Sequence, residues 1–224
     1  YKDFLASCDH ARSVSLLSAV DGLLQWDEQT MLPSAAGDFR AEQVAALAAI
    51  THAQRTEKEQ GERLQKLRDS SLEKEWPRVV EATIRLLHAD FQKQSRIPGK
   101  LVQELARTSI EAQQAWVRAV KASEWKPMVT HLEKMFALKR ELAACQSPDL
   151  DPYDALLDDY EPGARWKSVN ATFSRLRKAL APLVRGCIES SEGPQETILR
   201  GNFLLQSQQA FVRHVIEEIG FSFD

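Results

Sequence analysis

The sequence is poor in the residue types that most often form reactive sites. Its 224 residues include three cysteines, five histidines and nine glycines. Cys8, Cys145 and Cys187 are odd in number and far apart, which favours reduced thiols in a cytoplasmic protein over a disulfide framework. The glycines are scattered, so we expect no glycine-rich phosphate loop. The absence of GxSxG and of a reactive-cysteine motif gives no support to a nucleophilic triad.

Histidine spacing argues against a metal site in this chain. No two histidines are four residues apart, so HExxH is absent, and none follows a glutamate by three, so Glu-x-x-His is absent too. His214 shares a helix face with Glu217 and Glu218, but such neighbours are typical of a solvated helix surface. We expect no catalytic residue and no metal ligand in this chain, and no cofactor bound by it alone.

Long hydrophobic runs and an excess of one charge are also missing. No apolar run approaches the ~20 residues that span a bilayer. Lysine and arginine number 29 against 32 aspartates and glutamates, a formal net charge of −3. We therefore expect neither a membrane nor a nucleic acid as a partner. The chain starts at Tyr1 without a signal-peptide pattern, so its start is expected to be trimmed.

What the sequence does contain is helical periodicity in almost every segment. Val169, Phe173, Leu176 and Leu180 are spaced by four, three and four residues, and no segment alternates convincingly with a period of two. The prediction is an all-α fold, an array of long antiparallel helices. We treat residues 1–224 as a single helical region, with a helical hairpin over 1–54, charged helices over 55–95 and a helical array over 96–224. The predicted buried face of the helix after Pro98 comprises Leu101, Leu105, Ala112, Trp116 and Val120.

The hairpin connection between Leu23 and Arg40 is rich in functional groups. Pro33 should end the first helix before it, and Gly37 should open the second. Trp26 and Met31 are large apolar groups that would cost free energy in water, so the connection is expected to fold over something. Two interpretations of Trp26, Asp27 and Glu28 stay open. They line a substrate groove, or they pin the hairpin by packing and capping.

Two charged segments also allow alternatives. Residues 55–75 are either a partner-binding arm or, as we favour, a solvated helix pair broken near Asp69. Ser70 with Glu73 matches a capping box, which predicts a helix start. Farther along lies an acidic cluster that could supply acid and base groups or, as we favour, cap and hydrate a short helix. The cluster consists of Asp154, Asp158, Asp159 and Glu161.

Two short segments resemble signatures of the Taq-type (thermostable) metallocarboxypeptidase family. They are LLQWDEQTMLP, followed by FRAEQVAALAAITH, and PYDALLDDYEPG from Pro152 to Gly163. Between them, the spacing of Trp116, Trp125 and Arg140 is also similar to the family's, so the resemblance covers nearly the whole chain. It implies the amino-terminal helical part of the family's fold.

The family's metal chemistry is not in this chain. Members carry HPF, DxRxT and a zinc-binding HExxH with a downstream glutamate, and none of these motifs occurs here. The resemblance implies the amino-terminal half of a carboxypeptidase that releases carboxy-terminal amino acids from peptides, with the catalytic half absent. Zinc or another divalent metal, and the peptide, would be bound by that half. Homodimers are also implied, as is a groove that Trp26, Asp27 and Met31 are expected to line.

An alternative is a non-enzymatic helical module, derived from that family and retained for interaction or regulation. The two possibilities differ in what surface they need. Half of an enzyme should expose apolar side chains where the other half packs, because independent soluble monomers rarely expose large apolar patches. We expect Trp26, Met31 and Leu32, together with Phe221 and Phe223, to contribute to such a surface.

Overall fold

The computed structural model describes residues 1–71, 76–190, 193 and 196–223. All regular elements within these residues are helices, and no strand occurs among them, which confirms the predicted all-α fold. The chain forms two compact units, residues Tyr1–Trp166 and Lys167–Asp224. The single helical region expected over 1–224 stays a prediction.

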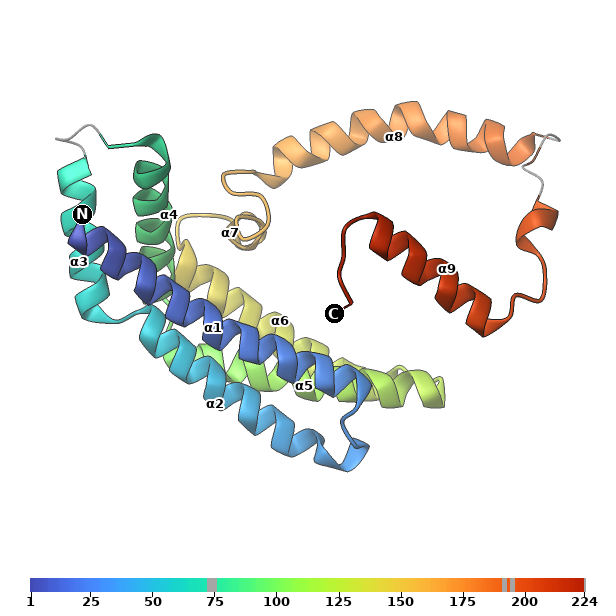
Figure 1. Ribbon diagram of the computed structural model, residues 1–224, viewed down its shortest axis with the longest axis horizontal. Coiled ribbons are helices and arrows are strands. Elements are labelled where there is room, and N and C mark those ends of the chain that lie inside the picture. The colour runs from blue at the N-terminus through green and yellow to red at the C-terminus, as the bar shows by residue number, and fades with distance from the viewer. Residues whose placement is uncertain (72–75, 191–192, 194–195, 224) are drawn as a thin grey trace. The chain divides into compact units, whose positions relative to one another are not determined.

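Seven α-helices and one short 3-10 helix are described in the first unit (Figure 1). They are α1 (Lys2–Thr30), η1 (Ser34–Ala36), α2 (Gly37–Arg55), α3 (Lys58–Ser71), α4 (Arg78–Ser95), α5 (Gly99–Ala122), α6 (Lys126–Gln146) and α7 (Pro152–Leu157). The helix α8 (Trp166–Glu189) begins at the last residue of this unit, and η2 (Glu196–Leu199) and α9 (Leu205–Glu218) follow it.

The hairpin formed by α1 and α2 follows the prediction. The two helices lie side by side in Figure 1. Pro33 has an extended backbone after the end of α1, since its ring fixes φ and it has no N–H for a helical bond. Gly37 opens α2 where α5 approaches closely. A Cβ at Gly37 would lie 2.1 Å from the side-chain amide nitrogen of Gln114.

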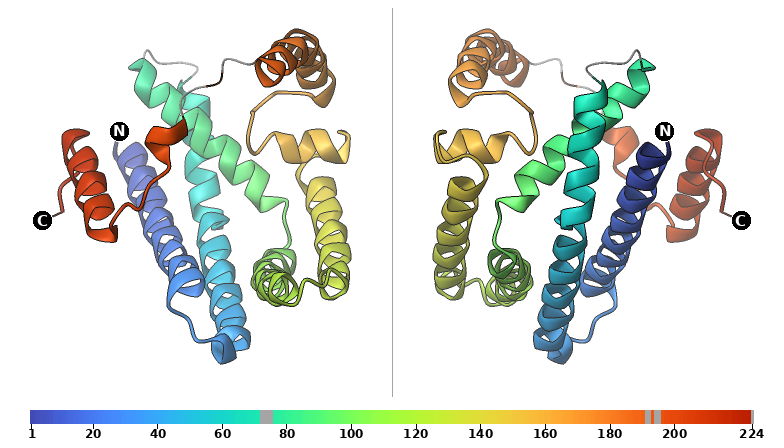
Figure 2. Two further views of the ribbon diagram at one scale, coloured as in Figure 1. Left: turned by 90° about the vertical axis from the view of Figure 1, so that its right-hand side faces the viewer. Right: turned by 90° about the vertical axis from the view of Figure 1, so that its left-hand side faces the viewer.

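Apolar side chains, several of them alanines, form the contacts of α5, which lies between α2 and α6 (Figure 2). Three buried clusters follow its length, the first with Ala41, Val44 and Ile110, the second with Ile97, Leu101 and Leu142, and the third with Ala115, Ala119 and Met128. Alanines allow two helix backbones to approach closely, and close packing gives these contacts their dispersion energy.

One part of the predicted core is wrong. Trp116 and Val120 were expected on the buried face of α5, but they are 47% and 57% exposed. Ala115 and Ala119 are buried instead, one residue earlier in each case. Successive residues are 100° apart around a helix, so α5 carries two neighbouring apolar stripes, one with Trp116 and Val120 and one with Ala115 and Ala119. The stripe with the smaller side chains packs against α6.

The helix start predicted at Ser70 is also wrong. Ser70 lies in the last turn of α3, and its hydroxyl donates to the carbonyl of Leu67 at 3.0 Å. The break expected near Asp69 lies slightly later, since α3 ends at Ser71 and α4 begins at Arg78; Glu73 lies outside the described residues. Leu64 of α3 and Ile84 of α4 are fully buried.

The second unit exposes the apolar stripes that its sequence predicted. Gly220 has φ +92° after α9, the left-handed conformation expected of a helix cap. No described residue of α8 or α9 is buried. Their exposed apolar side chains include Phe173, Leu176, Leu180, Leu183, Val184, Ile188, Phe211, Val212 and Val215.

Among the described residues of the whole chain, we find no helix of the length and hydrophobicity that crossing a bilayer requires.

Candidate functional site

Arg40 joins the two helices of the hairpin. Its guanidinium is buried, and it donates to the Asp27 carboxylate at 2.5 Å and to the backbone carbonyl of Leu24 at 2.5 Å. Its Nε also donates to Gln43 at 3.1 Å. Asp27 therefore pins α1 to α2, which is one of the two roles left open by the sequence.

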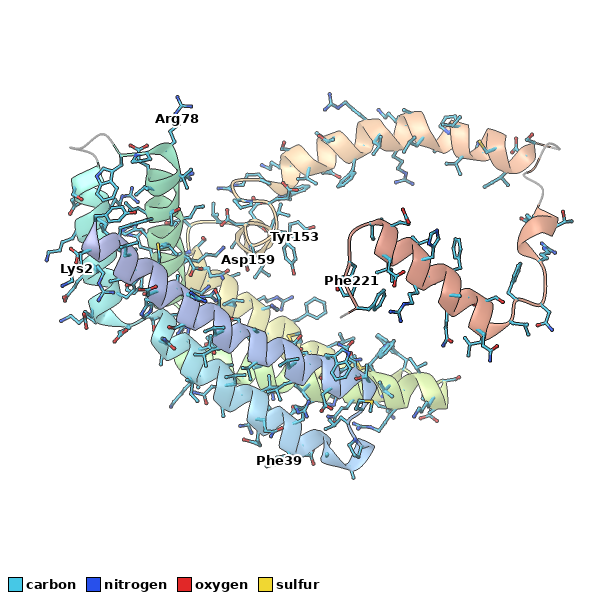
Figure 3. All side chains as sticks on the ribbon, in the orientation of Figure 1. Lys2, Phe39, Arg78, Tyr153, Asp159 and Phe221 are labelled. Carbon is cyan, nitrogen blue, oxygen red and sulfur yellow. The ribbon has the colours of Figure 1, made fainter. Side chains whose placement is uncertain are left out.

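The apolar residues of the connection lie on the surface. Trp26 is 60% and Met31 70% exposed, and Leu32 is half-buried. Phe39, labelled in Figure 3 near the start of α2, is exposed as well. The predicted exposure of Trp26 and Met31 is thus confirmed, as is that of Phe221 and Phe223 in the second unit. A groove lined by Trp26, Asp27 and Met31 stays a prediction.

A cavity that was not predicted from the sequence lies within the first unit. It has a volume of about 370 Å³ and is lined by residues of α1, α2 and α5, with Gln94 from α4. The side that α1 contributes is polar, with Asp21, Gln25 and Glu28 on one face. Their spacing of four and three residues is the signal that the sequence offered.

Glu28 carries an unusual carboxylate in this cavity. Its Oε1 is buried and has no hydrogen-bond partner. Burial raises the pKa of the Glu28 carboxyl above its usual value, and the nearby charge of Arg40 opposes that rise only in part. The arrangement places a carboxyl group beside apolar side chains of α2 and α5, which is typical of a surface that can bind a small ligand.

The acidic cluster around α7 is structural, as favoured from the sequence. Asp151 caps α7 by accepting from the Tyr153 N–H at 2.9 Å, and Asp154 accepts from the Trp166 N–H at 2.6 Å. Asp158 and Asp159 hold the ammonium of Lys93 from α4 at 3.1 and 2.6 Å. Figure 3 labels Tyr153 and Asp159 on this segment.

The pKa shifts around Lys93 agree with that structural role. The backbone N–H of Gly163 and then the Lys93 ammonium lower the pKa of Asp158. Burial of Lys93 would lower its own pKa, but its hydrogen bonds to Asp159 and Asp158 raise it overall. Both groups are thereby held in their charged forms, which suits an ion pair rather than proton transfer.

Of the histidines, His10 and His52 form hydrogen bonds with backbone carbonyls, and His214 is exposed to solvent. His52 donates to the carbonyl of Ile97 at 2.9 Å, and His10 bonds the carbonyl of Gln54. Within the described part of the chain, no three histidine, cysteine or acidic side chains are close enough to hold a metal ion together. Those residues therefore do not fit a zinc site.

Comparison with known proteins covers nearly the full sequence. Residues 7–224 match the family model described as carboxypeptidase Taq (M32) metallopeptidase. Thermostable carboxypeptidase 1 of Thermus thermophilus is 29% identical over 222 residues, which is 95% of this chain and 44% of that protein. Carboxypeptidase 1 of Bacillus subtilis is 25% identical, with coverage of 96% and 43%.

A solved structure supports the same relationship. The crystal structure of the M32 carboxypeptidase from Deinococcus radiodurans R1 is 28% identical, with a TM-score of 0.79 over all of this chain and 44% of that one. The chain thus spans less than half the length of these relatives. Its fold, its two signature segments and the match over residues 7–224 together show that it belongs to the carboxypeptidase Taq (M32) metallopeptidase family.

Proposed function

We propose that this chain is the amino-terminal helical portion of a zinc-dependent carboxypeptidase that releases carboxy-terminal amino acids from peptides. The observation that carries the proposal is the family match over residues 7–224, with coverage of only 43–44% of the curated relatives' length. Zinc, or another divalent ion, would be bound by the catalytic portion of the enzyme, which carries HExxH. The described residues do not fit a metal, so no reaction step is assigned to them.

The exposed apolar residues support the proposal that a second, metal-bearing portion of the enzyme packs against this one. The stripe of α8 lies open along its length, and Trp26 and Met31 are exposed at the hairpin connection. Contiguous apolar surface of this kind marks an interaction site. We propose that Trp26, Asp27 and Met31 line the groove once the metal-bearing portion is in place. A cytoplasmic location and a homodimer, both expected from the sequence, are part of the proposal.

Complementation tests this function. The chain is co-expressed with the metal-bearing segment of the Bacillus subtilis relative, namely the part outside the match. We expect the two to co-purify with zinc and to release leucine from an amino-blocked alanyl-leucine. Each part alone should release none. Activity of this chain alone would refute the proposal, and failure of the two parts to associate would favour the non-enzymatic module.

A further inference from the structure

A buried histidine lies at the contact between α3 and α4, which pack against each other (Figure 1). His88 of α4 is only 4% exposed. Both nitrogens of its ring have partners on α3. Nδ1 lies 3.2 Å from the Arg68 guanidinium, and Nε2 lies 3.0 Å from the side-chain oxygen of Gln65. The amide of Gln92, one turn later on α4, lies 3.5 Å from Nε2.

These partners determine where the ring of His88 carries its proton. An arginine can only donate hydrogen bonds, so Nδ1 accepts from Arg68 and carries no hydrogen. The hydrogen of the neutral imidazole is then on Nε2, which donates to the Gln65 oxygen. A second proton, on Nδ1, would face the guanidinium that donates to it in the neutral form.

The charges that face His88 oppose its protonation. Burial lowers the pKa of the His88 ring most, and the positive charge of Arg68 lowers it further. Asp69, the next residue on α3, acts in the opposite direction but is outweighed. On α4 itself, Arg85 lies one turn before His88 and Glu81 two turns before, and both are exposed.

Several charged groups on the other elements around α4 form ion pairs of their own. These pairs are Asp90 with Arg55 of α2, Lys93 with Asp158 and Asp159 after α7, and His10 of α1 with Glu57. Within the described part of the chain, the partners of the His88 ring nitrogens therefore come from α3 and from α4 itself.

We propose that His88 makes the α3–α4 contact pH-sensitive, holding α3 on α4 while its ring is neutral and releasing α3 when its ring is protonated. Protonation replaces the hydrogen bond from Arg68 to Nδ1 by the repulsion of two cations. In the folded protein the pKa of His88 lies below the ordinary value of about 6.5. The stability that the neutral ring contributes is therefore complete above that pH and declines as the pH falls below it.

NMR titration of the histidine rings in the full chain tests the protonation state. We expect the Nε2–H tautomer at pH 7.5 and a titration midpoint for His88 below about 6.5. The signal of His88 is identified as the one missing from His88→Asn. A midpoint at or above about 6.5, or a neutral ring with its hydrogen on Nδ1, would overturn the proposal.

Hydrogen exchange at pH 7.5 and 5.5, corrected for the intrinsic exchange rates, tests the release. Opening of α3 and α4 should increase up to about tenfold at the lower pH, because an opened histidine with a pKa of about 6.5 gains one proton over this range. Aspartates and glutamates with ordinary pKa values are charged at both pH values. Peptides of α5 are the internal reference and should show no comparable increase.

Three variants separate this titration from other effects of pH. His88→Asn removes it but keeps an oxygen that can accept from Arg68, so opening of α3 and α4 should stay at its pH 7.5 level. The matched control is His214→Asn, the same change at an exposed histidine of α9, which should leave the response of α3 and α4 intact. Arg68→Gln keeps a donor for Nδ1 without the charge, so it should raise the midpoint of His88 even where His88→Asn loosens the contact.

Other results would contradict the proposal. They are opening of α3 and α4 at pH 5.5 that does not exceed that of α5, a full pH response in a folded His88→Asn variant, and an unchanged His88 midpoint in Arg68→Gln. None of these measurements involves peptidase activity, so this proposal and the carboxypeptidase function can fail independently of each other.

Discussion

A single arginine holds the hairpin connection in its conformation. Arg40 is buried and donates to a carboxylate, a backbone carbonyl and a side-chain amide. The planar guanidinium can make these bonds simultaneously because its donors point in fixed directions. An apolar residue could satisfy neither Asp27 nor the Leu24 carbonyl.

Replacement of this arginine should therefore be costly. Arg40→Met leaves the carbonyl of Leu24 and the carboxylate of Asp27 without their donors, and we expect the free energy of unfolding to fall by about 2 kcal/mol. Urea unfolding followed by circular dichroism measures the change. The control is Lys134→Met, which removes a half-exposed ion pair with Glu104 and should cost less than about 1 kcal/mol. Equal losses in the two variants would mean that Arg40 acts as an ordinary surface charge.

Residues next to each other in the sequence differ in how well they could be predicted. Asp27 was recognised as a possible pin because it lies close to Pro33, which ends the first helix and opens the connection. Its arginine partner is 13 residues away and could not be identified from sequence alone. Glu28 was expected either to line a substrate groove or to help pin the hairpin, but its place in the cavity formed with α2 and α5 could not be predicted. That role depends on which side chains α2 and α5 place opposite it, and helix packing sets these positions rather than local pattern.

At the scale of the element, glycine marks a close approach between α3 and α4. A Cβ on Gly61 would lie 2.2 Å from Cζ of Phe91, whereas one on Gly22 in α1 would have no atom within 4 Å. Both glycines lie in helices, where alanine is intrinsically better by about 1 kcal/mol. Substitution at Gly22 therefore reports helix propensity alone, whereas substitution at Gly61 reports helix propensity together with the packing against Phe91.

Gly61→Ala should destabilise the protein although it improves helix propensity. Displacement of the Phe91 ring costs about 1–3 kcal/mol, which exceeds the gain in propensity. Gly22→Ala should stabilise it by about 0.5–1 kcal/mol. Thermal unfolding of both variants provides the measurement. An increase in melting temperature for both would show that Phe91 moves aside at no cost.

Helix positions were predicted better than helix faces. Pro33, Gly37 and the Asp151–Pro152 pair mark helix ends by local backbone chemistry, and the structure agrees at each of them. The face of α5 was assigned by apolar character, which favoured Trp116 over Ala115. Contact with α6 selects the smaller residue, and sequence periodicity contains no information about the shape of the neighbouring helix.

At the scale of the whole molecule, buried residues are confined to the first unit among those that the structure describes. The stability of α8 and α9 in the isolated chain should accordingly be low, because most helix stability in proteins comes from packing of an apolar face. The sequence predicted the periodicity of α8 correctly, but periodicity does not reveal whether a partner covers the stripe.

Hydrogen exchange should separate the two units. Amides in α2 and α5 are expected to exchange only through openings that approach the global free energy of unfolding, whereas those of α8 and α9 should open at close to zero cost. Mass spectrometry of exchanged peptides reports both sets in one experiment. Protection of α8 equal to that of α5 in a monomeric sample would contradict this expectation.

The confinement of buried residues to the first unit also has a consequence for synthesis on the ribosome. Residues Tyr1–Trp166 emerge first and contain the buried clusters, so they can fold while later residues are still being added. The apolar stripe of α8 follows, and the described residues of its own unit leave it exposed. During that interval α8 is a segment that chaperones would recognise, and the yield of correctly folded protein in a cell should depend on how quickly the stripe is covered.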